Sequence, residues 1–170
     1  MKALVVVNYQ NDYVTGPLGS KFAKLIEKNI CTRIDEVLKD RGTLFLVVDY
    51  LPANHPGFVP KGKKKPVKYC VAGTSGADLY GKVSDYLSSG YMIRKDTLGS
   101  EELLKRLKSY DDIEICGVEA NSGIIATAVI AKTANPAAEV SVMQNCIASR
   151  DSELGEEALN VMASMDIKIL

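Results

Sequence analysis

A chain of 170 residues is close to the size of one domain, and a composition of 46% hydrophobic and 25% charged residues is that of an ordinary globular protein. Lysine and arginine together number 21, as do aspartate and glutamate, so the charge balance gives no reason to expect a nucleic acid or an anionic membrane as partner. The N-terminal apolar run is too short to cross a bilayer and lacks a small-residue cleavage site, so we expect no signal peptide and a cytoplasmic protein.

Strand and helix patterns alternate along the chain. Apolar runs rich in valine and isoleucine predict buried strands at residues 2–7, 44–48, 91–94, 113–117, 140–143 and 167–170. Helical periodicity predicts helices at residues 20–39, 100–107, 122–133 and 153–165. Such alternation implies parallel strands joined by right-handed crossovers, so we expect a single α/β domain over residues 1–170, with a mainly parallel sheet between two helical layers.

Ligands of open parallel sheets bind beyond the carboxyl ends of the strands. The residues in that place are 8–12, 49–55, Lys95 and 119–123. The connection from about residue 51 to 76 exceeds the usual loop length, which suggests a functional loop. Its lysine run at residues 61–65 is either a solvated loop or a charge that steers an anionic ligand.

Five segments match, in order and spacing, the motifs of one known family. They are residues 3–13 (ALVVVNYQNDY), 49–58 (DYLPANHPGF), 70–79 (CVAGTSGADL), 93–95 (IRK) and 117–128 (GVEANSGIIATA). Together they resemble the isochorismatase-like hydrolases, a superfamily that includes nicotinamidases, N-carbamoylsarcosine amidases and isochorismatases. The resemblance implies a sheet of about six strands, a small-molecule ligand, a homo-oligomer of two or four chains and a cis peptide between Val118 and Glu119.

The family's cysteine hydrolases use three catalytic groups. An aspartate at the end of the first strand takes the proton of a cysteine thiol, the thiolate attacks an amide carbonyl, and a lysine stabilises the charges. The resemblance places Asn8 at the aspartate position, Gly123 at the cysteine position and Lys95 at the lysine position. Because a carboxamide is not a useful base and glycine has no side chain, we expect no cysteine-hydrolase (amidase) activity but a retained small-molecule pocket. Four further residues are expected to contact its ligand: Glu119, Asp12, Tyr13 and Tyr50.

Two alternatives remain. True isochorismatases carry glycine at the same turn and hydrolyse a vinyl ether without a covalent intermediate, using the strand aspartate as acid. An active non-covalent hydrolase of a small, possibly anionic substrate would therefore need Asp12 or Glu119 as its acid. The second alternative is a structural subunit whose pocket is filled by tyrosine or leucine side chains. A thiol or another carboxylate beside Lys95 would reverse the expectation of lost chemistry.

The metal-binding pattern of nicotinamidases is incomplete in this chain. The resemblance matches Asp49 and His55 to two of the ligands, but Leu51 and Tyr69 occupy the other two positions. Two protein ligands rarely make a dedicated zinc site, so we expect neither a metal nor another cofactor.

Several other side chains near strand ends allow two interpretations each. Ser122 is either a replacement nucleophile or, like its neighbour Asn121, a helix cap. Cys116 and Cys146 are either packed in the core or near the pocket mouth. The four cysteines are widely spaced and match no zinc pattern, so we expect reduced thiols.

Overall fold

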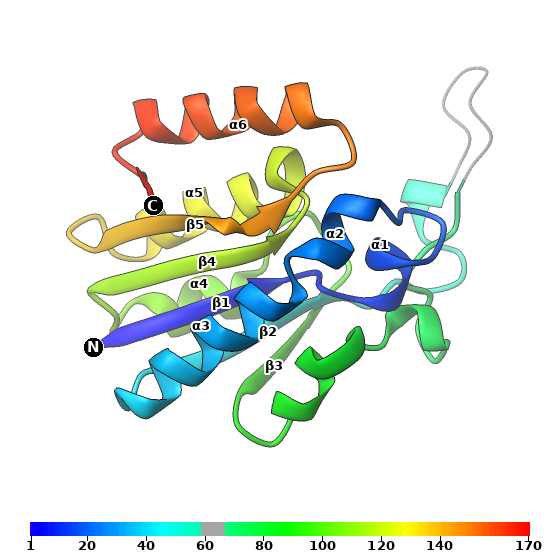
Figure 1. Cartoon of the computed structure of the whole chain (residues 1–170), viewed down its shortest axis with the longest axis horizontal. Helices are drawn as coiled ribbons and strands as arrows, with labels where there is room; N and C mark the ends of the chain where they lie inside the picture. The colour runs from blue at the N-terminus through cyan, green and yellow to red at the C-terminus, as the bar shows by residue number, and fades with distance from the viewer. Residues whose placement is uncertain (59–66) are drawn as a thin grey trace.

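A parallel sheet forms the centre of the molecule (Figure 1). The computed structural model describes residues 1–58 and 67–170, so the lysine run at 61–65 lies outside the described residues. Within them, six strands pair in parallel in the order β3-β2-β1-β4-β5-β6. The strands are β1 (Lys2–Val7), β2 (Thr43–Asp49), β3 (Tyr91–Lys95), β4 (Asp112–Val118), β5 (Glu139–Ala148) and β6 (Lys168–Ile169). The predicted fold class and the six-stranded sheet are confirmed.

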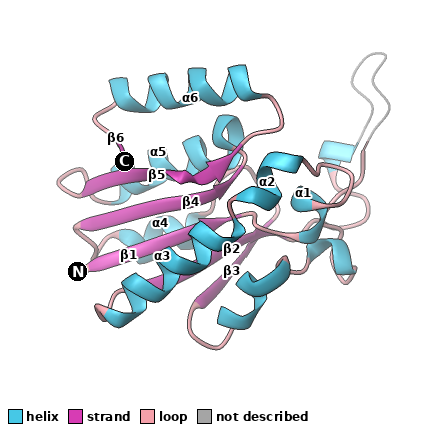
Figure 2. Ribbon diagram, in the orientation of Figure 1, coloured by secondary structure: helices cyan, strands magenta, loops and turns pink. Residues whose placement is uncertain are grey.

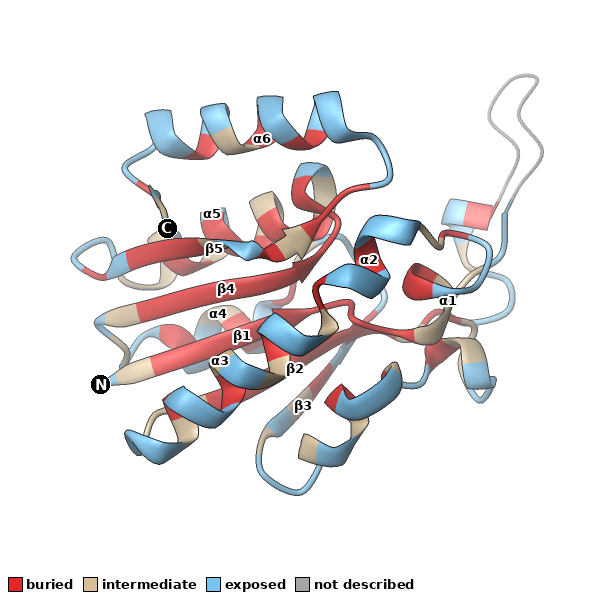
Figure 3. Ribbon diagram, in the orientation of Figure 1, coloured by how far each residue is buried: buried red, intermediate tan, exposed pale blue. Residues whose placement is uncertain are grey.

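Helices cover both faces of the sheet (Figure 2). They are α1 (Asn11–Val14), α2 (Lys21–Leu25), α3 (Glu27–Lys39), α4 (Glu101–Leu107), α5 (Ile125–Ala134) and α6 (Ser152–Ser164). Successive strand residues point to opposite faces, so Leu4 and Val6 pack with Ile30 of α3. Val5 and Val7 belong to the other core cluster, which includes buried apolar residues from α4, α5 and α6, such as Leu107, Ala128 and Met162. The sheet is buried between these layers, and the outer sides of the helices are exposed (Figure 3).

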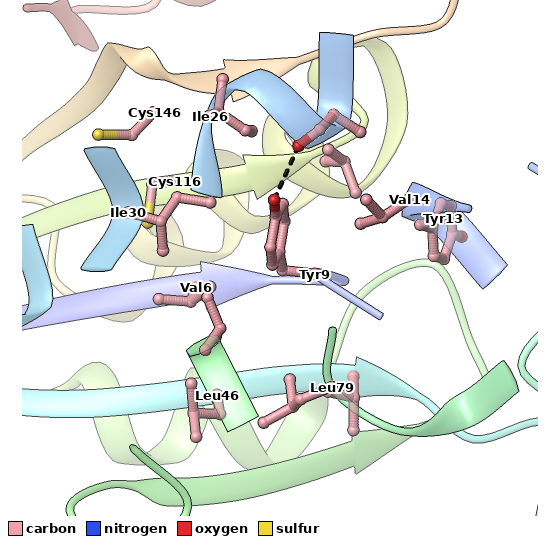
Figure 4. Close-up of a cluster of buried hydrophobic side chains, with 14 of the residues drawn as sticks. Val6, Tyr9, Tyr13, Val14, Ile26, Ile30, Leu46, Leu79, Cys116 and Cys146 are labelled. Carbon is pink, nitrogen blue, oxygen red and sulfur yellow. Dashed lines mark hydrogen bonds between the residues drawn. The ribbon is translucent and has the colours of Figure 1, made fainter. Parts of the chain in front are cut away.

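The predicted helix at residues 20–39 is two helices, α2 and α3, which meet at Ile26. The buried Tyr9 hydroxyl donates a hydrogen bond of 2.8 Å to the carbonyl of Ala23, next to the break (Figure 4). That carbonyl at the end of α2 therefore has a partner from outside the helix. Periodicity alone does not reveal such a contact, because its donor lies in another segment.

Strand β5 is longer than predicted, and the preceding helix α5 begins later than predicted, at Ile125 instead of residue 122. The pairing of β4 with β5 jumps from Ile115 opposite Val142 to Gly117 opposite Ile147, so β5 bulges and then continues to Ala148. The polar residues inside this bulge ended the predicted strand too early. The turn after β4 is a π-helical turn, Ala120–Ile124, which precedes α5.

The end of β4 requires a glycine. Gly117 has φ +114°, and a β-carbon there would lie 2.1 Å from the carbonyl oxygen of Val7 on β1. Only a residue without a side chain allows β1 and β4 to approach this closely. The peptide bond between Val118 and Glu119 is cis, as the resemblance implies. No helix in the described part of the chain is long and apolar enough to cross a membrane.

Candidate functional site

A cavity of about 210 Å³ lies at the carboxyl ends of the central strands. The ends of β1, β2 and β3 bring Asn8, Asp49 and Lys95 to it, and the turn after β4 adds Ser122 and Gly123. From β1 the chain first builds the sheet outward through β2 and β3, and then returns to place β4 on the other side of β1. Ligands of such sheets bind at this switch point between β1 and β4. The other lining residues are Tyr13, Leu51, His55, Tyr69, Asp96, Thr97 and Leu98.

The Asp49 carboxylate is the centre of the polar network in this cavity. Its Oδ1 forms an ion pair with the ammonium group of Lys95, and both residues are buried. Its Oδ2 accepts hydrogen bonds from Tyr13 Oη at 2.7 Å and from Asn8 Nδ2 at 3.1 Å. Gln10 fixes the backbone at the same point, because its side chain accepts from Asp49 N at 2.8 Å and donates to Asp49 O at 2.7 Å. The negative charge is thus neutralised inside the protein.

Asn8 retains an acceptor without a donor. The residue is 2% exposed and has φ 53°, a left-handed conformation that asparagine tolerates better than most residues. Its amide nitrogen is directed to Asp49, whereas its Oδ1 is buried and has no hydrogen-bond partner among residues 1–58 and 67–170. A buried acceptor without a donor costs free energy of about 1–3 kcal/mol, so a ligand or water that donates to Oδ1 gains an interaction.

Gly123 and Asn8 are neighbours, as the resemblance implies for the nucleophile and base positions. A β-carbon at position 123 would lie 3.3 Å from Asn8 Nδ2 and 3.1 Å from the carbonyl oxygen of Val118. Ser122 also lines the cavity. Neither the π-helical turn nor α5 has a side-chain cap, so the capping interpretation of Ser122 and Asn121 is wrong.

Asp12 and Glu119 lie outside the cavity lining. The Asp12 carboxylate accepts a hydrogen bond of 2.7 Å from Cys70 N, and it thereby ties α1 to the loop before the segment at 70–79. The Glu119 carboxylate accepts from Arg150 N at 2.9 Å and lies 3.5 Å from Arg150 Nε. Asp12 and the Oε2 atom of Glu119 are therefore bound to partners in the protein, whereas Glu119 Oε1 is buried without a hydrogen-bond partner among the described residues.

Two other carboxylates line the cavity, namely Asp49 and Asp96. Sequence reasoning matched Asp49 to a metal ligand and did not consider Asp96. Asp49 is a carboxylate beside Lys95, but its oxygens are already bound and no thiol lines the cavity, so its presence does not restore the cysteine-hydrolase groups. Its oxygens are engaged by three side chains, whereas the exposed Asp96 carboxylate has no hydrogen bond or ion pair within the described residues.

Tyr13 and Tyr50, both expected at the ligand, line different cavities. Tyr13 lines the cavity, and its pKa is raised well above the ordinary value by burial and by the nearby Asp49 charge. It therefore remains a protonated donor to Asp49. Tyr50 lies outside this cavity, with the Arg94 guanidinium 4.4 Å above its ring.

The residues at the nicotinamidase metal positions do not fit a divalent ion. His55 Nδ1 accepts from Gly57 N at 3.1 Å, so its Nε2 carries the proton and donates to the Asp96 carbonyl at 2.7 Å. The Asp49 carboxylate is already paired with Lys95. In the described ranges no group of three or more histidine, cysteine, aspartate or glutamate side chains is arranged to hold a metal.

Three of the four thiols are buried, and Cys31 is partly buried. Cys116 and Cys146 lie among apolar side chains such as Val6 and Ile30 (Figure 4). Burial raises the pKa of the Cys146 thiol to about 11 and that of Cys116 well above its ordinary value. Cys70 is also buried, and all four cysteines are free. None of them lines the cavity, so no thiolate is available beside Lys95.

The comparisons with known proteins agree with this parallel α/β architecture and its site at the strand ends. The model of the isochorismatase domain family matches residues 2–169, so the chain belongs to the isochorismatase family. A pyrazinamidase/nicotinamidase of Streptococcus mutans is similar in structure, with 24% identity, coverage of 100% of both chains and a TM-score of 0.85. A pyrazinamidase of Pyrococcus horikoshii in complex with zinc has 27% identity, coverage of 99% and 98%, and a TM-score of 0.86. The yeast nicotinamidase bound to the inhibitor nicotinaldehyde has 20% identity, coverage of 100% and 99%, and a TM-score of 0.80. A search of the curated proteins returned no match.

Proposed function

We propose that this protein has lost the cysteine-hydrolase reaction of its family and binds a small molecule in the cavity beside Asn8 and Lys95. The observation that carries the proposal is the adjacency of Asn8 and Gly123. Position 123, which offers no atom beyond its backbone, faces a carboxamide at position 8 that cannot take a proton. Replacing both groups removes the nucleophile and its base together, and such cooperating groups lose most of their rate when even one is absent.

The open space of the cavity supports a binding role over a filled, purely structural pocket. Tyr13, Leu51 and Tyr69 line about 210 Å³ without closing it. The Lys95 charge is paired with Asp49, and Asp96 at the rim is negative. The ligand we propose is therefore neutral and not anionic, and it donates an N–H or O–H hydrogen bond to Asn8 Oδ1.

A second candidate is a non-covalent hydrolase, which the carboxylates in the cavity favour. Of the two carboxylates, Asp96 is the one free to contact a substrate, because it lines the cavity and forms no hydrogen bond or ion pair with the described residues. Asp49 would act beside Lys95. In this candidate Asp96→Asn abolishes turnover of the substrate while binding persists. In the leading proposal the wild-type protein has no turnover for Asp96→Asn to remove.

The deciding experiment measures ammonia release from nicotinamide and pyrazinamide, and hydrolysis of isochorismate, by the purified wild-type protein. We expect no turnover, and turnover at ordinary enzymatic rates would contradict the proposal. The double variant Asn8→Asp/Gly123→Cys then reports on the pocket. We expect it to gain a thiol that reacts with iodoacetamide near neutral pH. Asn8→Asp/Gly123→Ala is the matched control, since it adds the same β-carbon without sulfur.

We also propose a cytoplasmic homo-oligomer, as the resemblance implies. A hollow of about 560 Å³ opens between α2 and α6, where Phe22 and Leu25 expose apolar side chains. We expect a second copy of the chain to cover it. Light scattering should give the mass of a dimer or tetramer, and Leu25→Glu should shift the mass toward the monomer. A wild-type monomer at micromolar concentration would contradict this expectation.

A further inference from the structure

Another hollow, of about 210 Å³, lies against β2 and β3, on the sheet face opposite the side chains of Asp49 and Lys95. It is called the second hollow below, and it is separate from the one between α2 and α6. Its floor includes the apolar side chains of Val48, Leu79 and Met92. Arg94 and Asp78 supply charges of opposite sign at the same hollow. None of these residues lines the cavity at Asn8 and Lys95.

The pleat of the two strands explains why two hollows lie back to back. Asp49 pairs in register with Lys95, and Val48 pairs with Arg94. Side chains one residue apart on a strand point to opposite faces. The Asp49–Lys95 pair therefore belongs to the cavity described above, whereas Arg94 belongs to the second hollow. Strand β3 is at the edge of the sheet, and two of the residues that line this hollow, Arg94 and Asp78, are exposed to solvent.

Arg94 is positioned but has no acidic partner. Its guanidinium lies 4.4 Å from the centre of the Tyr50 ring, and within the described residues it forms no hydrogen bond or ion pair. Arg106 provides the comparison, because it lies 5.2 Å from the Tyr91 ring and also pairs with Glu102 at 2.8 Å. Stacking holds the plane of a guanidinium while leaving its N–H donors free. The Arg94 guanidinium is therefore placed over a ring, and its N–H donors have no carboxylate partner among the described residues.

Asp78 presents the complementary charge. Its backbone carbonyl accepts from Asn11 N at 2.9 Å, which fixes the position of the residue. Its exposed carboxylate has no hydrogen bond or ion pair to any described residue, Arg94 included. An unpaired cation and an unpaired anion beside an apolar floor match a ligand that carries both charges and an apolar body.

We propose that this hollow is a second ligand site, for a zwitterion of the α-amino acid type with an aliphatic side chain. Arg94 binds the carboxylate through two parallel N–H donors. Asp78 accepts from the ammonium group, and the aliphatic side chain lies on Val48, Leu79 and Met92. The site is independent of the chemistry at Asn8 and Gly123, so either proposal can fail without the other.

The test uses three probes of the same shape in titrations followed by NMR of the backbone amides. L-leucine carries both charges, 4-methylpentanoate lacks the ammonium group, and 3-methylbutylamine lacks the carboxylate. We expect saturable binding of leucine, with shifts centred on Tyr50, Asp78 and Arg94, and at least tenfold weaker binding of each analogue. The proposal is overturned by no saturation up to about 10 mM leucine, a range that includes weak millimolar ligands. Equal binding of 4-methylpentanoate, or shifts centred on Asn8 and Gly123, would also overturn it.

Surface variants separate the site from nonspecific binding. Arg94→Gln should weaken leucine binding at least tenfold. Asp78→Asn should remove the preference for leucine over 4-methylpentanoate. Arg106→Gln is the matched control, since it removes another guanidinium stacked on a tyrosine but outside the hollow, and it should leave the affinity unchanged. All three residues are exposed, so unaltered spectra elsewhere will confirm the fold. An Arg94→Gln protein that binds leucine as the wild type does would overturn the proposal.

Discussion

The two halves of the family cavity differ in what they retain. The half built by β1, β2 and β3 keeps charged groups, with Asp49 paired to Lys95 and hydrogen-bonded to Asn8 and Tyr13. The half built by the turn after β4 keeps its backbone, including the cis peptide at Val118–Glu119, but ends in Gly123 with no reactive atom. In the function proposed above, the first half supplies the polar contacts to a ligand and the second half supplies only backbone.

The largest expected effect is on the charged half. Asp49→Ala should lower the free energy of unfolding by about 3–5 kcal/mol, because it leaves the buried Lys95 ammonium without its counterion. Urea denaturation followed by circular dichroism measures the loss. The double variant Asp49→Leu/Lys95→Met should recover part of it, since both charges of the pair are removed while the Asn8 and Tyr13 donors still lose their acceptor. A single variant as stable as the wild type would mean that the pair contributes nothing to the fold.

Two glycines sharpen the comparison within the turn half. Gly117→Ala should cost more than about 3 kcal/mol, because its β-carbon would lie 2.1 Å from Val7 O and its φ of +114° is unsuitable for alanine. Gly123→Ala should cost about 1 kcal/mol, since its closest contacts are 3.1 Å. Thermal unfolding of both variants tests the difference. Equal losses would show that Gly123 is as necessary to the backbone as Gly117.

The Asn8→Asp variant places a second carboxylate in the charged half. The new carboxylate would replace the Asn8 Nδ2 donor that lies 3.1 Å from Asp49 Oδ2, and like charges raise the pKa of one acid. A raised folded-state pKa means that the folded protein holds more protons than the unfolded chain. Stability relative to the wild type should therefore fall as pH rises above about 4, with a loss of about 1–3 kcal/mol near pH 7. Unfolding curves at pH 4.5 and 7.5 measure this, and a pH-independent difference would contradict it.

A small effect is also expected at Tyr13. Tyr13→Phe removes the hydrogen bond of 2.7 Å to Asp49 and should cost about 1.5 kcal/mol, within the range for bonds to charged groups. Tyr110→Phe is the control, because the Tyr110 hydroxyl donates to the neutral Thr43 Oγ1 at 3.1 Å and should cost less. The order of the two losses in urea is the measurement. A larger loss at Tyr110 would show that Tyr13 does not support the carboxylate.

The fold was predictable because its signals are local. The apolar run at 2–7 and the period of 3.6 after Ser20 determine strand and helix without knowledge of other segments. The break at Ile26 was not predictable, because it coincides with a hydrogen bond from Tyr9, which lies 14 residues away from Ala23. The length of β5 was not predictable either, because its bulge is defined by the pairing with β4 and not by a pattern within the segment.

The site was predictable in its positions but not in its contacts. The motifs brought Asn8, Lys95 and Gly123 to one cavity. They did not indicate that Asp49 pairs with Lys95, because the match treated Asp49 as a metal ligand. The register of β2 against β3 determines that pair, and register is a property of three-dimensional packing. The exposed Asp96 was missed because it belongs to none of the five segments.

The alternation of side chains along β2 and β3 has a wider consequence. The consecutive residues Arg94 and Lys95 line two different cavities, and their side chains point to opposite faces of the sheet. A substitution at one changes a ligand contact on its own side and leaves the chemistry of the other side in place. Inserting or deleting a single residue in either strand would exchange the two sets of side chains and destroy both hollows at once.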